Sequence, residues 1–407
     1  MIPKLTLDAF ALSPATSAAL EHLPGDRAFL RTTLAIQTGG IRAATAHYGR
    51  HPSPDILVVE SDSDAEGLMA ELEALAEMVE PGLKVVVIGT VNDIAIYRRL
   101  IGQGVADYLL APIDGPTLAA SVKALFRDPA AAPRGRLIAT IGARGGAGAS
   151  TVAHNVAWAL ADGAGQDVVL VDLDLAFGTA ALAFNLEPRQ SVAEALTQPD
   201  RLDGVLLDRF MVERGDHLKV LSTAGNLRDF PVVTVDAVEK LVDLARQSAP
   251  MVVLDLPHLW TDWTVALLAQ ADEVLVVARP DLASLRDCRN LLDQLSTRRG
   301  GETGLRLVLN QRDAARKVQL TAADFQDTLK IKPTACLAYE PQAVGEAANA
   351  GQMIAESCGR NHRLSQAFSD LAATIAGRPL PARAAKGLSA DRLNELFRRL
   401  IPSKATA

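Results

Sequence analysis

The sequence predicts an α/β protein built from two doubly wound domains, on three observations. Short runs rich in valine and leucine alternate with helical patterns along most of the chain, which is typical of strands covered by helices on both faces. A stretch rich in proline, alanine and arginine at 127–136 interrupts this alternation and indicates a linker. The chain has 407 residues, of which 49% are hydrophobic, so it is long enough for two or three buried cores.

The first predicted domain covers residues 1–126. Five apolar runs are expected to be strands, at 5–12, 28–36, 55–61, 84–90 and 106–112. Helical patterns lie between and after them, notably at 64–79, 93–104 and 115–126. Five strands with intervening helices predict a small doubly wound sheet.

The second predicted domain covers residues 137–380, and a tail follows at 381–407. Its expected strands lie at 138–142, 167–175, 218–223, 250–257, 273–280 and 305–311. These runs show little alternation between apolar and polar residues, which indicates a mostly parallel sheet covered on both faces.

Composition excludes several classes of protein. A formal net charge of −7 gives no reason to expect nucleic acid as the main partner. Cys288, Cys336 and Cys358 are widely spaced, which argues against a disulfide framework or a zinc site and fits a reducing cytosol. The seven histidines are scattered, and no two of them have the spacing of a metal site. The start of the chain does not resemble a signal peptide, and no stretch reaches the ~18 apolar residues of a membrane span. We therefore expect a soluble, cytoplasmic protein.

The most informative local motif is a glycine-rich turn, IATIGARGGAGAST at 138–151, which connects an apolar run to a helical pattern. Consecutive glycines let backbone N–H groups converge on one concavity, and the helix N-terminus adds a positive partial charge, so such a turn can hold phosphate. Gly145, Gly146 and Gly148 keep this geometry. Ser150 can ligate magnesium, and Thr151 can reach an α-phosphate. Taken alone, the turn is more often just a tight connection between a strand and a helix.

With four further motifs in the same order, the turn resembles that of the ParA/MinD family of deviant Walker-A ATPases, whose loop is KGGxGK[ST]T. The resemblance places Arg144 at the signature lysine and Ala147 at the variable position of the loop. Ala149 stands where the family has the lysine that grips phosphate. The resemblance implies a P-loop nucleotide-binding domain with ATP and Mg²⁺ as cofactors.

The other motifs imply further ligands. The run at 167–175 matches a strand ending in DxD, which gives Asp172 a place near the metal and Asp174 the role of orienting the attacking water. The resemblance also implies that Asp255 holds magnesium through water and that Asn310 reads the adenine edge. The segment 337–351 is similar to the family's closing segment.

Ala149 is the main departure from the family. A phosphate-loop lysine stabilises the charge on the transferring phosphoryl group, and alanine supplies none of that electrostatic effect. Arg144 is always charged and can bridge two phosphate oxygens, from its own or a facing subunit, without restoring the lost contact. We therefore expect ATP binding with slow or absent hydrolysis.

The first domain resembles a response-regulator receiver domain, a flavodoxin-like fold. In that family an aspartate ends the third strand and accepts phosphate, a serine or threonine ends the fourth, and a lysine–proline pair ends the fifth. The matching positions here hold Glu60, Thr90 and Ala111, so the resemblance implies a pseudo-receiver. Two interpretations of Glu60 stay open: a solvated carboxylate at a strand end, or a permanent mimic of phospho-aspartate.

A receiver-like domain followed by a ParA/MinD-like domain resembles the CpaE/TadZ family, localisation and assembly factors of Flp/Tad pili, and the stretch 170–196 is very similar to that family's. The resemblance implies a nucleotide-linked homodimer, action at a cell pole or at the inner membrane, and partners in the pilus secretion machinery. The alternative is a cycling ATPase of the MinD/FlhG kind that positions a division or flagellar structure.

Two further features each leave two interpretations open. Trp260 and Trp263 follow the 250–257 run, where the resemblance places a switch that contacts a dimer partner, and simple packing is the alternative. In the tail, five apolar residues fall on one helical face: Leu393, Leu396, Phe397, Leu400 and Ile401. That helix either packs on the second domain or lies on an anionic membrane surface.

Overall fold

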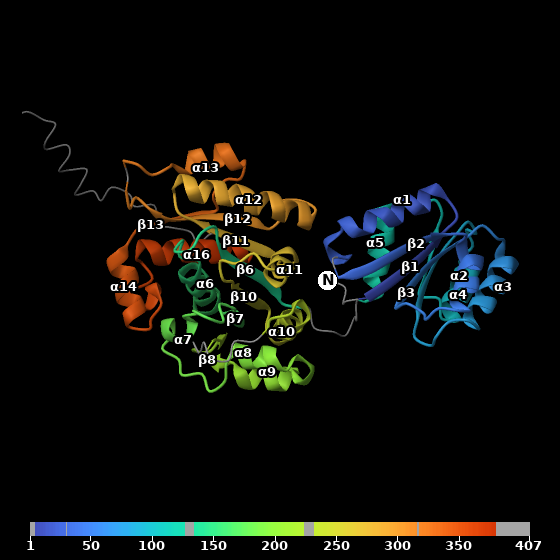
Figure 1. Ribbon diagram of the computed structural model, residues 1–407, viewed down its shortest axis with the longest axis horizontal. Helices are drawn as coiled ribbons and strands as arrows, with labels where there is room; N and C mark the ends of the chain where they lie inside the picture. The colour runs from blue at the N-terminus through green and yellow to red at the C-terminus, as the bar shows by residue number, and fades with distance from the viewer. Residues whose placement is uncertain (1–4, 30, 127–133, 224–231, 316, 380–407) are drawn as a thin grey trace, which may run out of the picture.

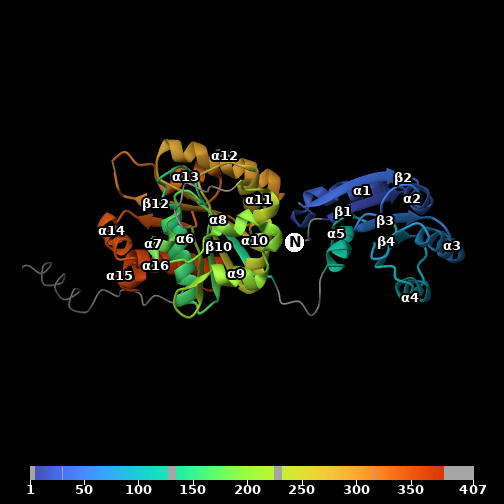
Figure 2. The same cartoon turned by 60° about the horizontal axis from the view of Figure 1, so that its bottom comes forward.

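The computed structural model describes residues 5–29, 31–126, 134–223, 232–315 and 317–379, and the structural statements below concern these residues. They form two α/β units with separate sheets, the first coloured blue to cyan and the second green to red in Figure 1. Figure 2 shows the same two units from a second direction, and each has helices on both faces of its sheet. The predicted fold class is confirmed.

The N-terminal unit is a parallel five-stranded sheet in the order β2-β1-β3-β4-β5. Its strands are β1 (Leu5–Ala11), β2 (Thr32–Thr38), β3 (Ile56–Ser61), β4 (Lys84–Gly89) and β5 (Asp107–Leu110). Its helices are α1 (Pro14–His22), α2 (Gly40–Tyr48), α3 (Ala65–Ala76), α4 (Ile94–Gly102) and α5 (Gly115–Ala124). Helices α1 and α5 cover one face of the sheet, while α2, α3 and α4 cover the other.

The C-terminal unit contains an eight-stranded sheet in the order β13-β12-β11-β6-β10-β7-β9-β8, parallel except for the antiparallel edge pair β8 and β9. Its strands are β6 (Arg136–Gly142), β7 (Val168–Asp172), β8 (Val212–Glu213), β9 (Leu218–Leu221), β10 (Met251–Asp255), β11 (Glu273–Ala278), β12 (Leu305–Arg312) and β13 (Ala335–Ala338). Strand β6 begins at Arg136, the last residue of the predicted linker, and the short strands β8 and β13 were not predicted.

Helices cover both faces of this sheet. Those on one face are α8 (Val192–Thr197), α9 (Gly204–Phe210), α10 (Val235–Ser248), α11 (Asp262–Gln270), α12 (Leu282–Arg299) and α13 (Ala322–Leu329). Those on the other are α6 (Ala149–Trp158), α7 (Ala180–Ala183), α14 (Pro341–Asn349), α15 (Ile354–Ser357) and α16 (Arg363–Ile375). Each helix turns apolar residues toward the sheet, so two apolar layers enclose strands that are buried on both faces.

The strand order determines where a ligand can bind. The chain leaves the central strand β6 for β7, two positions away on one side, and later places β11 on the other side of β6. In open α/β sheets, ligands bind outside the carboxyl ends of the strands at such a reversal. The glycine-rich turn lies at this point, between β6 and α6.

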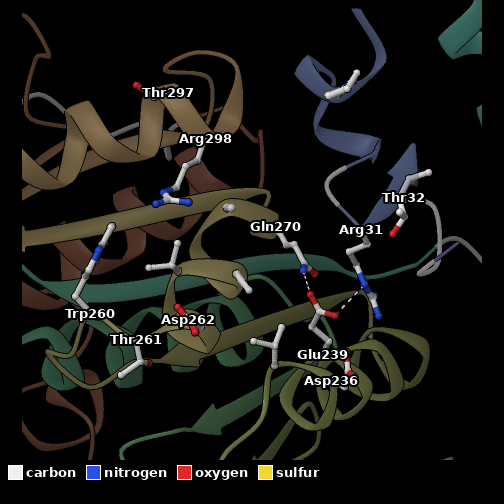
Figure 3. A pocket seen from close by; sticks show the side chains of 16 residues that line it. Arg31, Thr32, Asp236, Glu239, Trp260, Thr261, Asp262, Gln270, Thr297 and Arg298 are labelled. Atoms are coloured by element: carbon white, nitrogen blue, oxygen red, sulfur yellow. Dashed lines mark hydrogen bonds and ion pairs between the residues drawn. The ribbon is translucent and has the colours of Figure 1, made fainter. Parts of the chain in front are cut away.

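The two units meet through an ion-pair cluster. Arg31 precedes β2, and its guanidinium lies 2.9 Å from a carboxylate oxygen of Glu239 and 2.9 Å from one of Asp243, both on α10. Burial raises the pKa of Glu239, although the charge of Arg31 opposes the shift. A cavity of about 890 Å³ lies beside this cluster, and Figure 3 shows Arg31 and Glu239 at one end of it and Trp260 at the other.

Arg31→Ala should loosen the contact between the two units, because it leaves the buried Glu239 carboxylate without its cation. Breaking a buried pair by removing one partner costs about 3–5 kcal/mol. We expect a smaller loss here, because the units can separate and let water reach Glu239. Small-angle scattering should show a larger radius of gyration, and calorimetry should resolve two unfolding transitions.

The matched control is Arg134→Ala. Arg134 contacts the same Asp243 at 3.5 Å, but its side chain is 37% exposed, so its removal should change little. Equal scattering curves for wild type and Arg31→Ala would contradict the prediction.

Candidate functional site

The loop between β6 and α6 has a backbone that only glycine adopts easily. Gly146 has φ +76° and Gly148 has φ +85°, both in the left-handed region. A Cβ at Gly148 would lie 2.4 Å from Nδ2 of Asn310. Among the described residues no side chain caps the start of α6, so the N–H groups of its first turn are free to bind an anion. This geometry fits a phosphate group.

Two amides at the end of β12 hold the loop from one side. Asn310 donates from Nδ2 to the carbonyl of Ala147 at 2.9 Å, and Gln311 donates from Nε2 to the carbonyl of Gly146 at 3.2 Å. The structure therefore brings Asn310 to the predicted nucleotide loop. Its role in reading adenine stays a prediction.

Arg144 points away from the loop and toward α12. Its Nη1 donates to Oδ2 of Asp287 at 3.2 Å. The guanidinium is nearly half exposed, and an exposed pair of this kind contributes only about 0–1 kcal/mol. Arg144 can therefore leave Asp287 at little cost in free energy when an anion approaches.

Two carboxylates lie side by side behind the loop. Asp172 ends β7 and Asp255 ends β10, and the parallel register pairs these two residues directly. Both are fully buried. The Asp172 carboxylate accepts hydrogen bonds from the backbone N–H of Asp174 and of Ala180. Burial, and next the neighbouring charge of Asp255, raise the pKa of Asp172 to about 7. A bound cation would favour the ionised pair, so these oxygens fit a divalent metal.

Ser150 and Thr151 lie in the first turn of α6 and are half-buried. Together with His154 and Thr179 they line a cavity of about 290 Å³ beside the acid pair. Helix α6 packs on β10, so Ser150 in α6 lies close to Asp255 at the end of that strand. The predicted phosphate and metal residues thus surround one region of the molecule.

His154 is a site residue that the sequence analysis missed. It is 3% exposed, and its Nε2 lies 3.2 Å from Oδ2 of Asp255. With Asp172 the two residues form a group whose ligand atoms all lie within 4.8 Å of one another. Sequence spacing considered histidines only in pairs, and it could not show this group, because three separate elements assemble one histidine and two aspartates. The only local signal was its position four residues after Ser150, on the same face of α6.

The two tryptophans after β10 occupy different environments. Trp263 is 9% exposed and packs into the core of its own unit, which favours simple packing over the interface for this residue. Trp260 is 46% exposed and lines the cavity between the two units (Figure 3). Asp174 is half-buried, accepts a hydrogen bond from the Phe177 N–H, and lines a separate cavity of about 440 Å³.

In the N-terminal unit, the carboxylate of Glu60 is held by the loop after β1. It accepts hydrogen bonds from the backbone N–H of Leu12 at 2.6 Å and of Ser13 at 2.8 Å, and from the Ser13 hydroxyl at 2.7 Å. Burial opposes ionisation, but these hydrogen bonds outweigh it and hold the pKa of Glu60 below its ordinary value. The interpretation of Glu60 as a solvated carboxylate is wrong, since it is only 6% exposed.

The other two predicted receiver positions lie directly after strands. Thr90 follows β4 and is exposed, and Ala111 follows β5. The apolar tail residues Leu393, Leu396, Phe397, Leu400 and Ile401 lie outside the described residues. Among the helices that the structure describes, none has the length and apolar character needed to cross a membrane.

Comparison with known proteins relates the chain to several families. Residues 136–333 match the family model of the cellulose biosynthesis protein BcsQ. A pilus assembly protein CpaE from Caulobacter crescentus is 38% identical over 99% of its chain and 30% of this one, with a TM-score of 0.29. A ParA family ATPase from Chlorobium tepidum is 23% identical, with 58% of this chain and 98% of that one covered and a TM-score of 0.54. MinD from Pyrococcus horikoshii, solved with Mg-ADP, is 17% identical, with 59% and 95% covered and a TM-score of 0.52.

The last two similarities concern the fold, and they agree with the strand order and the loop described above. The relationship to CpaE depends on sequence identity over nearly all of the Caulobacter chain. The protein therefore belongs to the CpaE family, and its second unit has the fold of ParA and MinD proteins.

Proposed function

We propose that the protein is an ATP-binding, dimerising localisation and assembly factor for Flp/Tad pili, with slow or absent ATP hydrolysis. One observation carries the proposal: the phosphate loop keeps its left-handed glycines and its buried acid pair, while Ala149 replaces the lysine. The cradle for a nucleotide is present, and the main cationic group for phosphoryl transfer is missing.

The described residues of the site divide into two tasks. The loop from Gly145 to Gly148 and the first turn of α6 bind phosphate oxygens through backbone N–H groups. Ser150, Asp172 and Asp255 offer oxygen ligands to Mg²⁺, which would neutralise phosphate charge when bound. That MinD holds Mg-ADP supports this choice of cofactor.

Hydrolysis is limited by the charge that the loop lacks. Asp174 can orient a water molecule, but nothing at position 149 follows the phosphoryl group as charge develops on it. Arg144 is the nearest candidate substitute in the loop, and it contacts Asp287 instead. In this proposal a bound nucleotide stabilises the dimer and is not used to drive repeated cycles of hydrolysis. Such a dimerisation switch suits a localisation factor.

The pseudo-receiver serves as a docking module in this proposal. Its acceptor position is a glutamate engaged by three hydrogen bonds, and Arg31 connects the unit to α10 of the nucleotide-binding domain. We propose the predicted domains, pseudo-receiver 1–126, linker 127–136, nucleotide-binding domain 137–380 and tail 381–407, except that β6 already begins at Arg136. Partners of the dimer are components of the pilus secretion machinery, at a cell pole and at the inner-membrane surface of the cytoplasm.

The protein should bind ATP and Mg²⁺ but hydrolyse ATP far more slowly than MinD-like enzymes. Calorimetry measures binding, and phosphate release on the same preparation measures turnover. Gly148→Val should abolish binding, because its Cβ would strike Asn310 and its φ would be strained. Ala149→Lys should bind ATP and raise turnover by about tenfold or more.

Gly163→Ala is the matched control for Gly148→Val, because a Cβ at Gly163 meets nothing within 4 Å. It should bind ATP as wild type does. Partner-stimulated turnover of wild type at the rate of an ordinary MinD would favour the cycling ATPase, and no binding at millimolar ATP would contradict the proposal.

The N-terminal unit should not accept a phosphoryl group from acetyl phosphate. Glu60 is held by Leu12 and Ser13, and no lysine is present at position 111. Intact mass should stay unchanged in wild type. The matched variant carries both Glu60→Asp and Ala111→Lys, which supply the two missing groups. An acid-labile mass gain near Glu60 in wild type would refute the prediction.

The tail should bind anionic vesicles when nucleotide is present and salt is low. The five apolar residues on one predicted helical face, flanked by Arg392, Arg398 and Arg399, are typical of a membrane-surface helix. A single short helix binds weakly, so two tails in a dimer are required. Truncation after Gly387 should abolish cosedimentation. Equal cosedimentation of truncated and full-length protein would favour the packed helix.

A further inference from the structure

A buried group of three side chains lies beneath the phosphate loop, and the proposed nucleotide chemistry does not use all of it. His154 comes from α6, Asp172 from the end of β7 and Asp255 from the end of β10. Their ligand atoms lie within 4.8 Å of one another, and all three residues are buried. A histidine is not required for Mg²⁺ or for phosphate, so its presence here needs its own explanation.

The contact between His154 and Asp255 is not an ordinary hydrogen bond. Nε2 of His154 lies 3.2 Å from Oδ2 of Asp255, within ion-pair distance. Neither atom has a hydrogen-bond partner among the described residues, and both are shielded from solvent. Buried polar atoms are normally satisfied, so two facing atoms without partners indicate a missing third participant.

A metal ion accounts for this geometry. Nitrogen and oxygen ligands bind a divalent ion at about 2.0–2.2 Å, so two neighbouring ligand atoms lie roughly 3.0–3.4 Å apart. The observed 3.2 Å falls in that range without the alignment that a hydrogen bond needs. The Asp172 carboxylate is oriented by the N–H groups of Asp174 and Ala180, as the ligands of metal sites usually are.

The ligand types select the class of ion. Mg²⁺ prefers oxygen ligands and retains several waters, whereas imidazole suits first-row transition ions. One imidazole and two carboxylates form a set with mixed nitrogen and oxygen donors and two negative charges. Residues 149–160, which form α6 and its extension, include no Lys or Arg. A divalent transition ion would therefore balance the charge of the two carboxylates.

A cavity lies next to the group. His154, together with Ser150 and Thr151, lines the cavity of about 290 Å³. A cavity of this size and partly polar lining holds several water molecules, so a hydrated ion can approach and exchange its waters for side-chain ligands.

We propose that His154, Asp172 and Asp255 form a binding site for a divalent transition-metal ion that does not require nucleotide. The site shares its acid pair with the proposed Mg²⁺ position, so a resident ion would change which metal accompanies ATP. The inference does not depend on ATP binding, because metal alone is the probe.

Co²⁺ alone, in the absence of nucleotide, tests the site, because the visible absorption of bound Co²⁺ reports its ligands. The full-length chain should carry His51→Ala and His217→Ala, since the stacked pair His47 and His51 and the exposed pair His217 and Asp167 could hold metal at the surface. This background protein should bind one equivalent of Co²⁺ by equilibrium dialysis. Zn²⁺ should displace the ion, and excess Mg²⁺ should not.

His154→Gln and His154→Leu in that background should weaken Co²⁺ binding at least tenfold and remove the absorption bands. X-ray absorption of the Zn²⁺ form of the background protein provides a measurement that does not depend on those variants folding, and it should show imidazole and carboxylate ligands without sulfur. The proposal is overturned if the background protein binds no Co²⁺, if the bands survive in both His154 variants, or if the Zn²⁺ shell lacks imidazole. In those cases His154 and Asp255 form an internal contact only.

Discussion

The site depends on two carboxylates that are buried side by side at the carboxyl ends of two inner strands of the second sheet. Asp172 and Asp255 are neighbours because β7 and β10 pair in parallel with these residues in register. Two adjacent buried negative charges are costly without a cation, and the raised pKa of Asp172 expresses that cost. The loop, α6 and His154 are all placed where they can supply or hold positive charge.

The proposed phosphate loop combines left-handed glycines with an alanine at the position of the expected lysine. Its left-handed glycines and the amides of Asn310 and Gln311 hold the backbone as a phosphate cradle requires. Ala149 removes one positive charge from that cradle, and Arg144 keeps another within reach at its rim. Binding and turnover depend on different groups, and this difference is the basis of the proposed function, in which binding is retained and turnover is lost.

The contact between the two units also depends on a cation that lies beside two carboxylates. Arg31 reaches from the N-terminal unit to two carboxylates on α10, and the segment Trp260–Asp262 after β10 lines the same cavity. A change in the position of Trp260 or Asp262 would alter the wall of that cavity. The ion pairs thus connect the C-terminal unit physically to the N-terminal unit.

The sequence by itself determined the fold class, the order of nearly all strands and the phosphate loop, because apolar runs and glycine spacing are local signals. It did not reveal β8 and β13, which are too short for a period to show, or the engagement of Glu60 by the loop after β1. Only the tertiary structure decided that Trp263 is core and Trp260 is exposed, because Trp260 precedes α11, Trp263 lies in its first turn, and packing covers only the second. It also brought His154 to Asp172 and Asp255, because contacts between a helix and two strands far apart in the chain leave no mark in linear spacing.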